Sequence, residues 1–359
     1  MAYQMAENQS MSPLDGANGT AEDAGQQFYK VWVLNSSLSS GVWWTSYIAQ
    51  VYLLGAIDIV GIFFNILSFL TLLNEEGKLC SQNVLLMGLS VADGLYLIGN
   101  FFTFPVGAIY VTIKGDLTYH AFVSRYVLTP FFITRVLALY MVVLVTFDRF
   151  IAVYYPLKSA LYCTVNGAVI QIVVLVVAAV LVEVIPRYGW TALIKDPLYN
   201  VHMYNGHQMV IHCFLPVLFV FIFNSFIIRA LRNSRRVSGK TNDTHTALTK
   251  RLLVVSTAFL CCALPVFLEG IMVEIVHHAV NPAADMAFNF VLLLSIICVA
   301  FNCGMNLILY YLTGARFRNS FARMFVNPCL RTFKKRPQIQ SHVQLTTSFT
   351  ATTDISSVA

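Results

Sequence analysis

The chain has 359 residues, of which 57% are hydrophobic and only 11% are charged. In soluble domains about a quarter of the residues are charged. This composition therefore excludes an ordinary soluble domain and indicates that most of the chain lies in lipid. The formal net charge of +6 does not predict a nucleic-acid partner, because no basic groove is interleaved with a soluble fold.

Seven apolar segments are each long enough to cross a membrane, since a helix needs about 20 apolar residues to span a core of about 30 Å. Each is expected to be helical because lipid offers no partner to unpaired backbone groups. A β-barrel would show alternating segments of about ten residues, which these unbroken runs exclude. The sequence therefore predicts an all-α membrane protein, a seven-transmembrane helix bundle. The segments are 47–73, 83–111, 122–147, 165–186, 207–231, 252–278 and 285–311.

The basic residues predict the orientation of the bundle. If residues 1–46 lie outside, the inner loops and tail hold 17 of the 23 lysines and arginines, in agreement with the positive-inside rule. Three glycosylation sequons, at Asn8, Asn18 and Asn35, lie in the same N-terminal tail and support this orientation. We therefore expect a multi-pass plasma-membrane protein with an extracellular N-terminus and a cytoplasmic C-terminus.

The segment after the seventh span is predicted to be an amphipathic interfacial helix. Phe317, Phe321 and Phe325 recur there at helical spacing between arginines, which is typical of a helix on an anionic inner leaflet. Cys329 follows closely and is a candidate for palmitoylation; the alternative is an ordinary free thiol. The expected regions are a disordered, glycosylated extracellular tail (1–46), the bundle (47–313), the amphipathic juxtamembrane helix (314–327) and a disordered cytoplasmic tail (328–359).

Four polar side chains inside the apolar segments are candidates for function, because polar groups are costly to bury in a membrane. Asn65 and Asp93 lie in the first two segments, and Asn302 and Asn306 are four residues apart in the last, on one helix face. They either form a water- or Na⁺-filled pocket around Asp93 or only hydrogen-bond the helices together. Apart from such an ion no cofactor is expected, and the spacing of the eight cysteines offers no metal site.

Prolines inside four segments predict bent helices, because each frees a carbonyl and clashes with the preceding turn. They are Pro105, Pro130, Pro216 and Pro265. Four bent helices predict a bundle that opens a cavity on one side and can hinge, an arrangement that would also fit a transporter.

Five motifs occur in order along the segments. They are Asn65, "LSVAD" (Leu89–Asp93), "DRF" (Asp148–Phe150), "CALP" (Cys262–Pro265) and "NLILY" (Asn306–Tyr310), followed by Phe317. Together they resemble the rhodopsin-like (class A) G-protein-coupled receptors over residues 47–327. Within that family, "DRFIAVYYPLK", Pro130 and "VIPRYGW" (Val184–Trp190) are similar to invertebrate FMRFamide-type neuropeptide receptors.

The resemblance implies a role for each matching residue. Arg149 would hold Asp148 at rest and turn toward a heterotrimeric G protein in the active state, while Tyr310 would swing inward. The implied coupling switch is Asp148, Arg149, Phe150, Asn306 and Tyr310. The implied packing switch between pocket and cytoplasm is Leu139, Pro216, Phe259 and Pro265. The implied sodium pocket is Asn65, Asp93, Asn302 and Asn306.

Several positions depart from the family's pattern. Ser124 stands where the family carries a cysteine, and the second outer loop has no cysteine either, so no disulfide is expected there. Ala263 replaces the tryptophan two residues before Pro265, which removes that switch residue. The other departures are Leu307 for the proline of the seventh segment, Ala138 at the sodium site, Asn224 for a tyrosine and His245 for an acid that locks Arg149.

The resemblance also narrows the classes of ligand that are expected. No lysine occurs between Arg251 and Lys334, so the last segment cannot form a retinal Schiff base, and Phe131 stands where amine receptors carry an aspartate. A buried Arg135 needs a partner, either a glutamate of the bundle or the ligand. An amidated, cationic peptide would suit the acids near the outer mouth. The predicted pocket residues are Phe131, Arg135, Glu183, Glu269 and Glu274.

The predicted function is therefore a receptor for an extracellular, amidated FMRFamide-like neuropeptide that signals through heterotrimeric G proteins. The alternatives are a receptor for a non-peptide ligand and a transporter. The last 19 residues hold nine serines and threonines, predicted sites for a receptor kinase and for arrestin docking. An enzyme is not expected: the histidines at 202, 207, 212, 277 and 278 are assigned to surface or packing roles, since a spacing of five is not one α-helical face.

Overall fold

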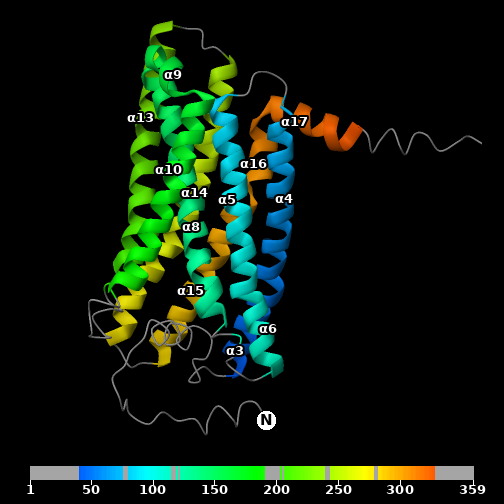
Figure 1. The fold of residues 1–359 in the computed structure, drawn as a ribbon, viewed down its shortest axis with the longest axis vertical. Helices are drawn as coiled ribbons and strands as arrows, with labels where there is room; N and C mark the ends of the chain where they lie inside the picture. Colours follow the sequence, from blue (N-terminus) through cyan, green and yellow to red (C-terminus); the bar gives the residue numbers. More distant parts are fainter. Residues whose placement is uncertain are drawn as a thin grey trace, which may run out of the picture. The chain divides into compact units, whose positions relative to one another are not determined.

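The computed structural model describes residues 40–75, 80–114, 122–190, 206–238, 243–278 and 282–327, together with Tyr119 and Met203. All regular structure in this part of the chain is helical, as predicted. The chain divides into two compact units, Met1–Ser320 and Phe321–Ala359. The first unit contains the helix bundle (Figure 1), and the second contains the π-helical turn η5 (Ala322–Val326).

The predicted segments correspond to helices of the first unit. In chain order these are α3 (Ser40–Ile48), η1 (Ala49–Leu54) and α4 (Gly55–Leu73); α5 (Ser81–Thr103) and α6 (Pro105–Lys114); η2 (Val123–Val127) and α8 (Leu128–Tyr154); α10 (Val165–Val184) and η3 (Ile185–Trp190); η4 (Val210–Phe214) and α13 (Leu215–Ser238); α14 (Asp243–His278); and α15 (Pro282–Gly304) and α16 (Asn306–Thr313). The short helices α9 (Pro156–Tyr162) and α17 (Ala315–Phe321) follow α8 and α16. Six of the helices are long and apolar enough to cross a membrane, and the described apolar part of α14, Ser256–Met272, is shorter.

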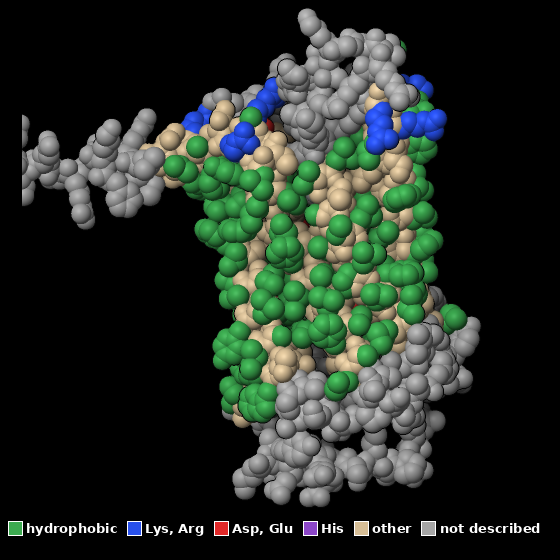
Figure 2. All heavy atoms as spheres, turned by 180° about the vertical axis from the view of Figure 1, so that it is seen from behind, with side chains coloured by type: hydrophobic (Ala, Val, Ile, Leu, Met, Phe, Trp, Pro, Cys, Tyr) green, Lys and Arg blue, Asp and Glu red, His purple; other side chains and the backbone are tan. Residues whose placement is uncertain are grey.

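The helices α5 and α8 form the centre of the bundle. Helix α5 packs against α4, α8, α10 and α15, and α8 packs against α5, α10, α13 and α14. In the span Ser81–Tyr110, which contains α5, 61% of the most apolar stretch is buried, whereas in Val165–Gly189, which contains α10, only 17% is buried. The rest of α10 therefore presents apolar side chains outward, as a helix in contact with lipid does. Figure 2 shows the same pattern, with apolar side chains along the flanks of the helices and lysines and arginines gathered at one end.

The prolines do not all act alike on the helices. Pro105 divides the second predicted segment, because α5 ends at Thr103 and α6 begins at Pro105. Pro130 and Pro216 instead lie just after the π-helical turns η2 and η4, where a wider turn accommodates a residue that cannot donate its backbone bond. Pro265 stays inside the single helix α14.

The seventh segment, predicted as one helix, is interrupted at Met305 between α15 and α16. The interruption occurs although Leu307 stands in place of the family's proline. Gly304 lies against Gly61 of α4 so closely that a Cβ on either glycine would approach the other's Cα to 3.0–3.2 Å. At the same point Asn65 Nδ2 donates to the carbonyl oxygen of Cys303 at 2.9 Å, so a side chain of α4 binds the backbone where the helix is interrupted.

Candidate functional site

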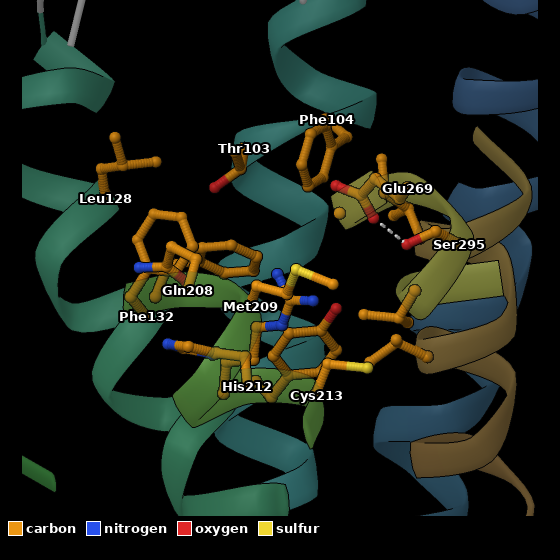
Figure 3. A pocket seen from close by; sticks show the side chains of 17 residues that line it. Thr103, Phe104, Leu128, Phe132, Gln208, Met209, His212, Cys213, Glu269 and Ser295 are labelled. Atoms are coloured by element: carbon orange, nitrogen blue, oxygen red, sulfur yellow. Dashed lines mark hydrogen bonds between the residues drawn. The ribbon is translucent and has the colours of Figure 1, made fainter. Parts of the chain in front are cut away.

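A cavity opens between the helices at the end of the bundle where α5 ends and α8 begins. Five spans contribute to its wall, through side chains of α5, α8, the fifth span, α14 and α15. Figure 3 shows Thr103, Phe104, Leu128, Phe132 and Met209 around this space. The wall is mostly apolar and aromatic with a few convergent polar groups, which is the composition typical of a ligand site.

The cavity holds one basic and one acidic side chain of the predicted pocket. Arg135 of α8 and Glu269 of α14 both line it, together with Phe131. Glu269 accepts a hydrogen bond from Ser295 of α15 (Figure 3). The Nε of Arg135 is buried without a hydrogen-bond partner, and in the described part of the chain no ion pair joins Arg135 to an acid. Sequence reasoning left an internal glutamate pair and a ligand contact open, and the described residues do not form the internal pair.

A second cavity, called the lower cavity below, lies deeper in the bundle than the first. It shares Tyr96, Arg135, His212 and two valines with the first cavity. Leu139 and Phe259 of the predicted packing switch line this lower cavity, next to Val217, which follows the buried Pro216. Ala138 and Ala263 line it as well. The space therefore lies where Ala263 stands in place of the tryptophan of the family's pattern.

The predicted polar cluster is divided among four helices, α4, α5, α15 and α16. Asp93 of α5 accepts a hydrogen bond from Asn306 of α16, and both side chains are buried. Asn65 binds backbone instead, donating from Nδ2 to the carbonyls of Gly61 and Cys303 at 2.9 Å each. Asn302 lines the lower cavity. These bonds join α4, α5 and the interruption of the seventh span.

The DRF motif lies at the opposite end of α8. Arg149 Nη2 is 3.6 Å from Asp148 Oδ2, and both side chains are nearly buried. Asp148 Oδ1 accepts a bond of 2.8 Å from Ser81 Oγ at the start of α5. Phe150 stacks on Phe223 with ring centroids 5.5 Å apart. Tyr310 of α16 is fully buried and contacts the ring of Phe317 edge-on.

Two buried polar pairs were missed from the sequence. Asn100 Nδ2 of α5 donates to both carboxylate oxygens of Asp58 in α4 at 3.0 Å. Ser256 of α14 and Asn224 of α13 exchange bonds of 2.8 and 3.1 Å. Asp58 and Asn100 are polar residues inside apolar segments, so the criterion that selected Asn65 and Asp93 could have found them.

Glu183 does not line the cavity, which differs from its predicted place. Its Oε1 lies 2.7 Å from Nε2 of His212 and 3.7 Å from Nε2 of His207. Sequence reasoning separated the two histidines because five residues is not one α-helical face. The π-helical turn Val210–Phe214 changes that geometry, because π-helical bonding joins residues five apart.

The other predicted residues lie outside the described residues. These are Asn8, Asn18, Asn35, Cys329, the serine- and threonine-rich tail, and the side chains of Glu274 and His245.

Comparison with known proteins identifies the family to which the chain belongs. The family model for 7 transmembrane receptor (rhodopsin family) matches residues 64–310. The FMRFamide receptor of Drosophila melanogaster is 22% identical over an alignment of 297 residues that covers 76% of this chain and 53% of that receptor, so the chain spans about half of its length. The FMRFamide peptide receptor frpr-18 of Caenorhabditis elegans is 25% identical over 77% of this chain and 69% of its own.

The somatostatin receptor type 2 of Mus musculus is 23% identical over 88% of this chain and 82% of its own. The family match covers more than half of the chain, and its residues include the cavity, the polar cluster and the DRF motif. The chain therefore belongs to the rhodopsin family of seven-transmembrane receptors, and is a multi-pass class A G-protein-coupled receptor and not an enzyme.

Proposed function

We propose that this receptor binds an extracellular peptide with an amidated C-terminus in the cavity and signals through a heterotrimeric G protein at the DRF end. The observation that carries the proposal is the presence of two unlike groups in one cavity wall, the guanidinium of Arg135 and the carboxylate of Glu269. The matched FMRFamide and somatostatin receptors, named for peptides, support the ligand class.

A carboxamide suits these two groups better than a carboxylate does. Its carbonyl oxygen accepts from a guanidinium such as that of Arg135, and its NH₂ donates to a carboxylate such as that of Glu269. A free C-terminal carboxylate would keep the first interaction and repel Glu269. The apolar and aromatic wall, including Phe131 and Phe132, would take the side chain that precedes the amide.

The lower cavity offers a route by which the ligand acts on the bundle. Ala263 leaves this cavity without the family's tryptophan, so a ligand side chain that enters it would press on Leu139 and Phe259 directly. Movement there would alter the packing of α8 against α14, and α8 carries Asp148 and Arg149 at its other end. Arg149 would then exchange Asp148 for the G protein, a two-state change of a buried ion pair.

The orientation with the N-terminus outside belongs to the same proposal. It puts the cavity on the extracellular side and the DRF motif on the cytoplasmic side. Lys158, Arg229 and Arg232 are exposed near the DRF end, in agreement with the positive-inside rule. Receptor kinases and arrestin would act on the serine- and threonine-rich tail at that side.

The ligand chemistry is tested by comparing the potency of amidated peptides with that of their free-acid counterparts on cells expressing the full chain. The free acid should be at least about tenfold weaker, because like charges repel in a poorly hydrated site. Glu269→Gln removes the repelling charge and should narrow that difference, while Arg135→Ala should weaken both forms. Equal potency of amide and acid on the unmodified receptor, or an unchanged ratio in Glu269→Gln, would contradict the assignment. Activation only by non-peptide ligands would favour the alternative receptor class.

A further inference from the structure

We propose that Glu183, His207 and His212 form a binding site for Zn²⁺ beside the ligand cavity. The three side chains come from two spans, α10 and the fifth span, and each offers one ligand atom. These atoms all lie within 4.8 Å of one another. Two imidazoles and one carboxylate form a common ligand set for zinc, with a fourth position left for water or another ligand.

The distances in the cluster are close to those that a metal requires. With bonds of about 2.0–2.2 Å, ligand atoms around a tetrahedral Zn²⁺ lie roughly 3.3 Å apart. Nε2 of His212 lies 2.7 Å from Glu183 Oε1, and Nε2 of His207 lies 3.7 Å from the same oxygen. Side-chain rotations alone are therefore enough to place the three atoms around one ion. Zn²⁺ would take the place of the hydrogen that joins His212 to Glu183.

The cluster also has buried polar atoms without a hydrogen-bond partner among the described residues. Glu183 is 1% exposed and its Oε2 has no hydrogen-bond partner, and neither has Nδ1 of His212, which is 4% exposed. Such atoms are costly to bury. A Zn²⁺ ion bound to the cluster would neutralise the carboxylate and allow it to bind through both oxygens.

Neighbouring charges limit the expected affinity. Arg187 of η3 lies over the ring of Phe132, 5.0 Å from its centroid, and the ring of His212 is 5.8 Å from the same ring. Arg135 also shares the cavity wall with His212. Two cations in this region repel a metal ion, so the affinity for Zn²⁺ is expected to be weaker than that of a structural zinc site.

A metal at this place would act on the ligand cavity. His212 belongs to the turn η4 and lines both cavities, whereas Glu183 belongs to the peripheral helix α10. Zn²⁺ would fix the turn to α10 and fix one side chain of the cavity wall. The ion is therefore expected to change agonist potency by altering the cavity wall, an effect that rests on the proposed function.

The site is tested by thermal unfolding of the purified full chain in detergent with added ZnCl₂ or MgCl₂. Ligands that bind only the folded state raise the unfolding midpoint in proportion to their occupancy. Zn²⁺ at about a hundredfold above its Kd should raise the midpoint, and Mg²⁺, which prefers oxygen ligands, should not. His207→Gln, His212→Gln and Glu183→Gln should each lose the Zn²⁺ shift, while His342→Ala, in the C-terminal tail, should keep it.

A variant with a different metal ligand separates metal binding from mere damage to the fold. His207→Cys replaces an imidazole with a thiolate that also binds zinc, so the Zn²⁺ shift should return in this variant and not in His207→Gln. No midpoint shift in the unmodified chain, or an equal shift in all the variants, would overturn the site. These readouts need no peptide ligand, so their outcome is independent of the proposed peptide.

Discussion

Replacing Gly61 by alanine should loosen the contact between α4 and α15. The new Cβ would lie 2.7 Å from Leu97 Cδ1 and 3.0 Å from the Cα of Gly304, where ordinary contact begins at 3.4 Å. Leu97 can rotate, but the backbone of Gly304 cannot, so the two helices must separate by about 0.4 Å. Overpacking of this kind costs roughly 1–3 kcal/mol, and the better helix propensity of alanine offsets up to about 1 kcal/mol of that cost.

Gly94→Ala is the matched control for this variant. Gly94 lies in α5, and the nearest atom to its new Cβ would be Asn65 Cβ at 3.8 Å, an ordinary contact. This variant should keep the propensity gain without the clash, so its unfolding midpoint should equal or exceed that of the unmodified chain. Thermal unfolding of both purified proteins by circular dichroism provides the measurement. A Gly61→Ala protein as stable as Gly94→Ala would refute the close approach at the interruption of the seventh span.

Two further predictions concern buried hydrogen bonds between helices. Ser256→Ala should lower the free energy of unfolding by about 1–3 kcal/mol, because it leaves the amide of Asn224 buried without a partner. The control Ser225→Ala, on an exposed face, should change the free energy of unfolding by less than about 0.5 kcal/mol. Equal effects of the two variants in chemical unfolding would contradict this prediction. Ser81→Ala removes the 2.8 Å hydrogen bond to Asp148 and should raise basal nucleotide exchange, because Asp148 then holds Arg149 less firmly. Unchanged basal exchange at equal surface expression would contradict the role of this hydrogen bond.

Sequence patterns predicted the helical bundle well because each span carries its own signal. An unbroken apolar run of sufficient length specifies a membrane helix without reference to its neighbours. Pro105 was predicted only to bend the second segment, and the structure divides that segment there, since α5 ends at Thr103 and α6 begins at Pro105. Features that depend on one helix alone were therefore predictable from the sequence.

Features that depend on two helices were harder to predict. The interruption at Met305 coincides with the contact of Gly61 with Gly304 and with the bond that Asn65 makes to Cys303, and neither contact is visible in one segment. His207 and His212 were separated because an α-helical period was assumed where the chain forms a π-helical turn. Glu183 was assigned to the cavity by depth alone, since its partners lie on another span.

The candidate site shows the same division. Phe131, Arg135 and Glu269 were predicted to belong to one pocket, and the structure brings them to one cavity wall. Ser295, which donates to Glu269, and Ser81, which donates to Asp148, were not predicted. Ser295 lies in an apolar segment, where a serine is common and usually bonds its own helix, and Ser81 precedes the second predicted segment. Neither position gives a sequence signal for a partner on another helix.

The most direct test of the proposed function is nucleotide exchange in membranes from cells that express the full chain, measured with a panel of amidated peptides. We expect that at least one amidated peptide stimulates exchange, and that Arg149→Ala abolishes the stimulation while the receptor still binds that peptide. Peptide binding with exchange retained in Arg149→Ala, or solute uptake without any exchange, would contradict a receptor that signals through its DRF motif.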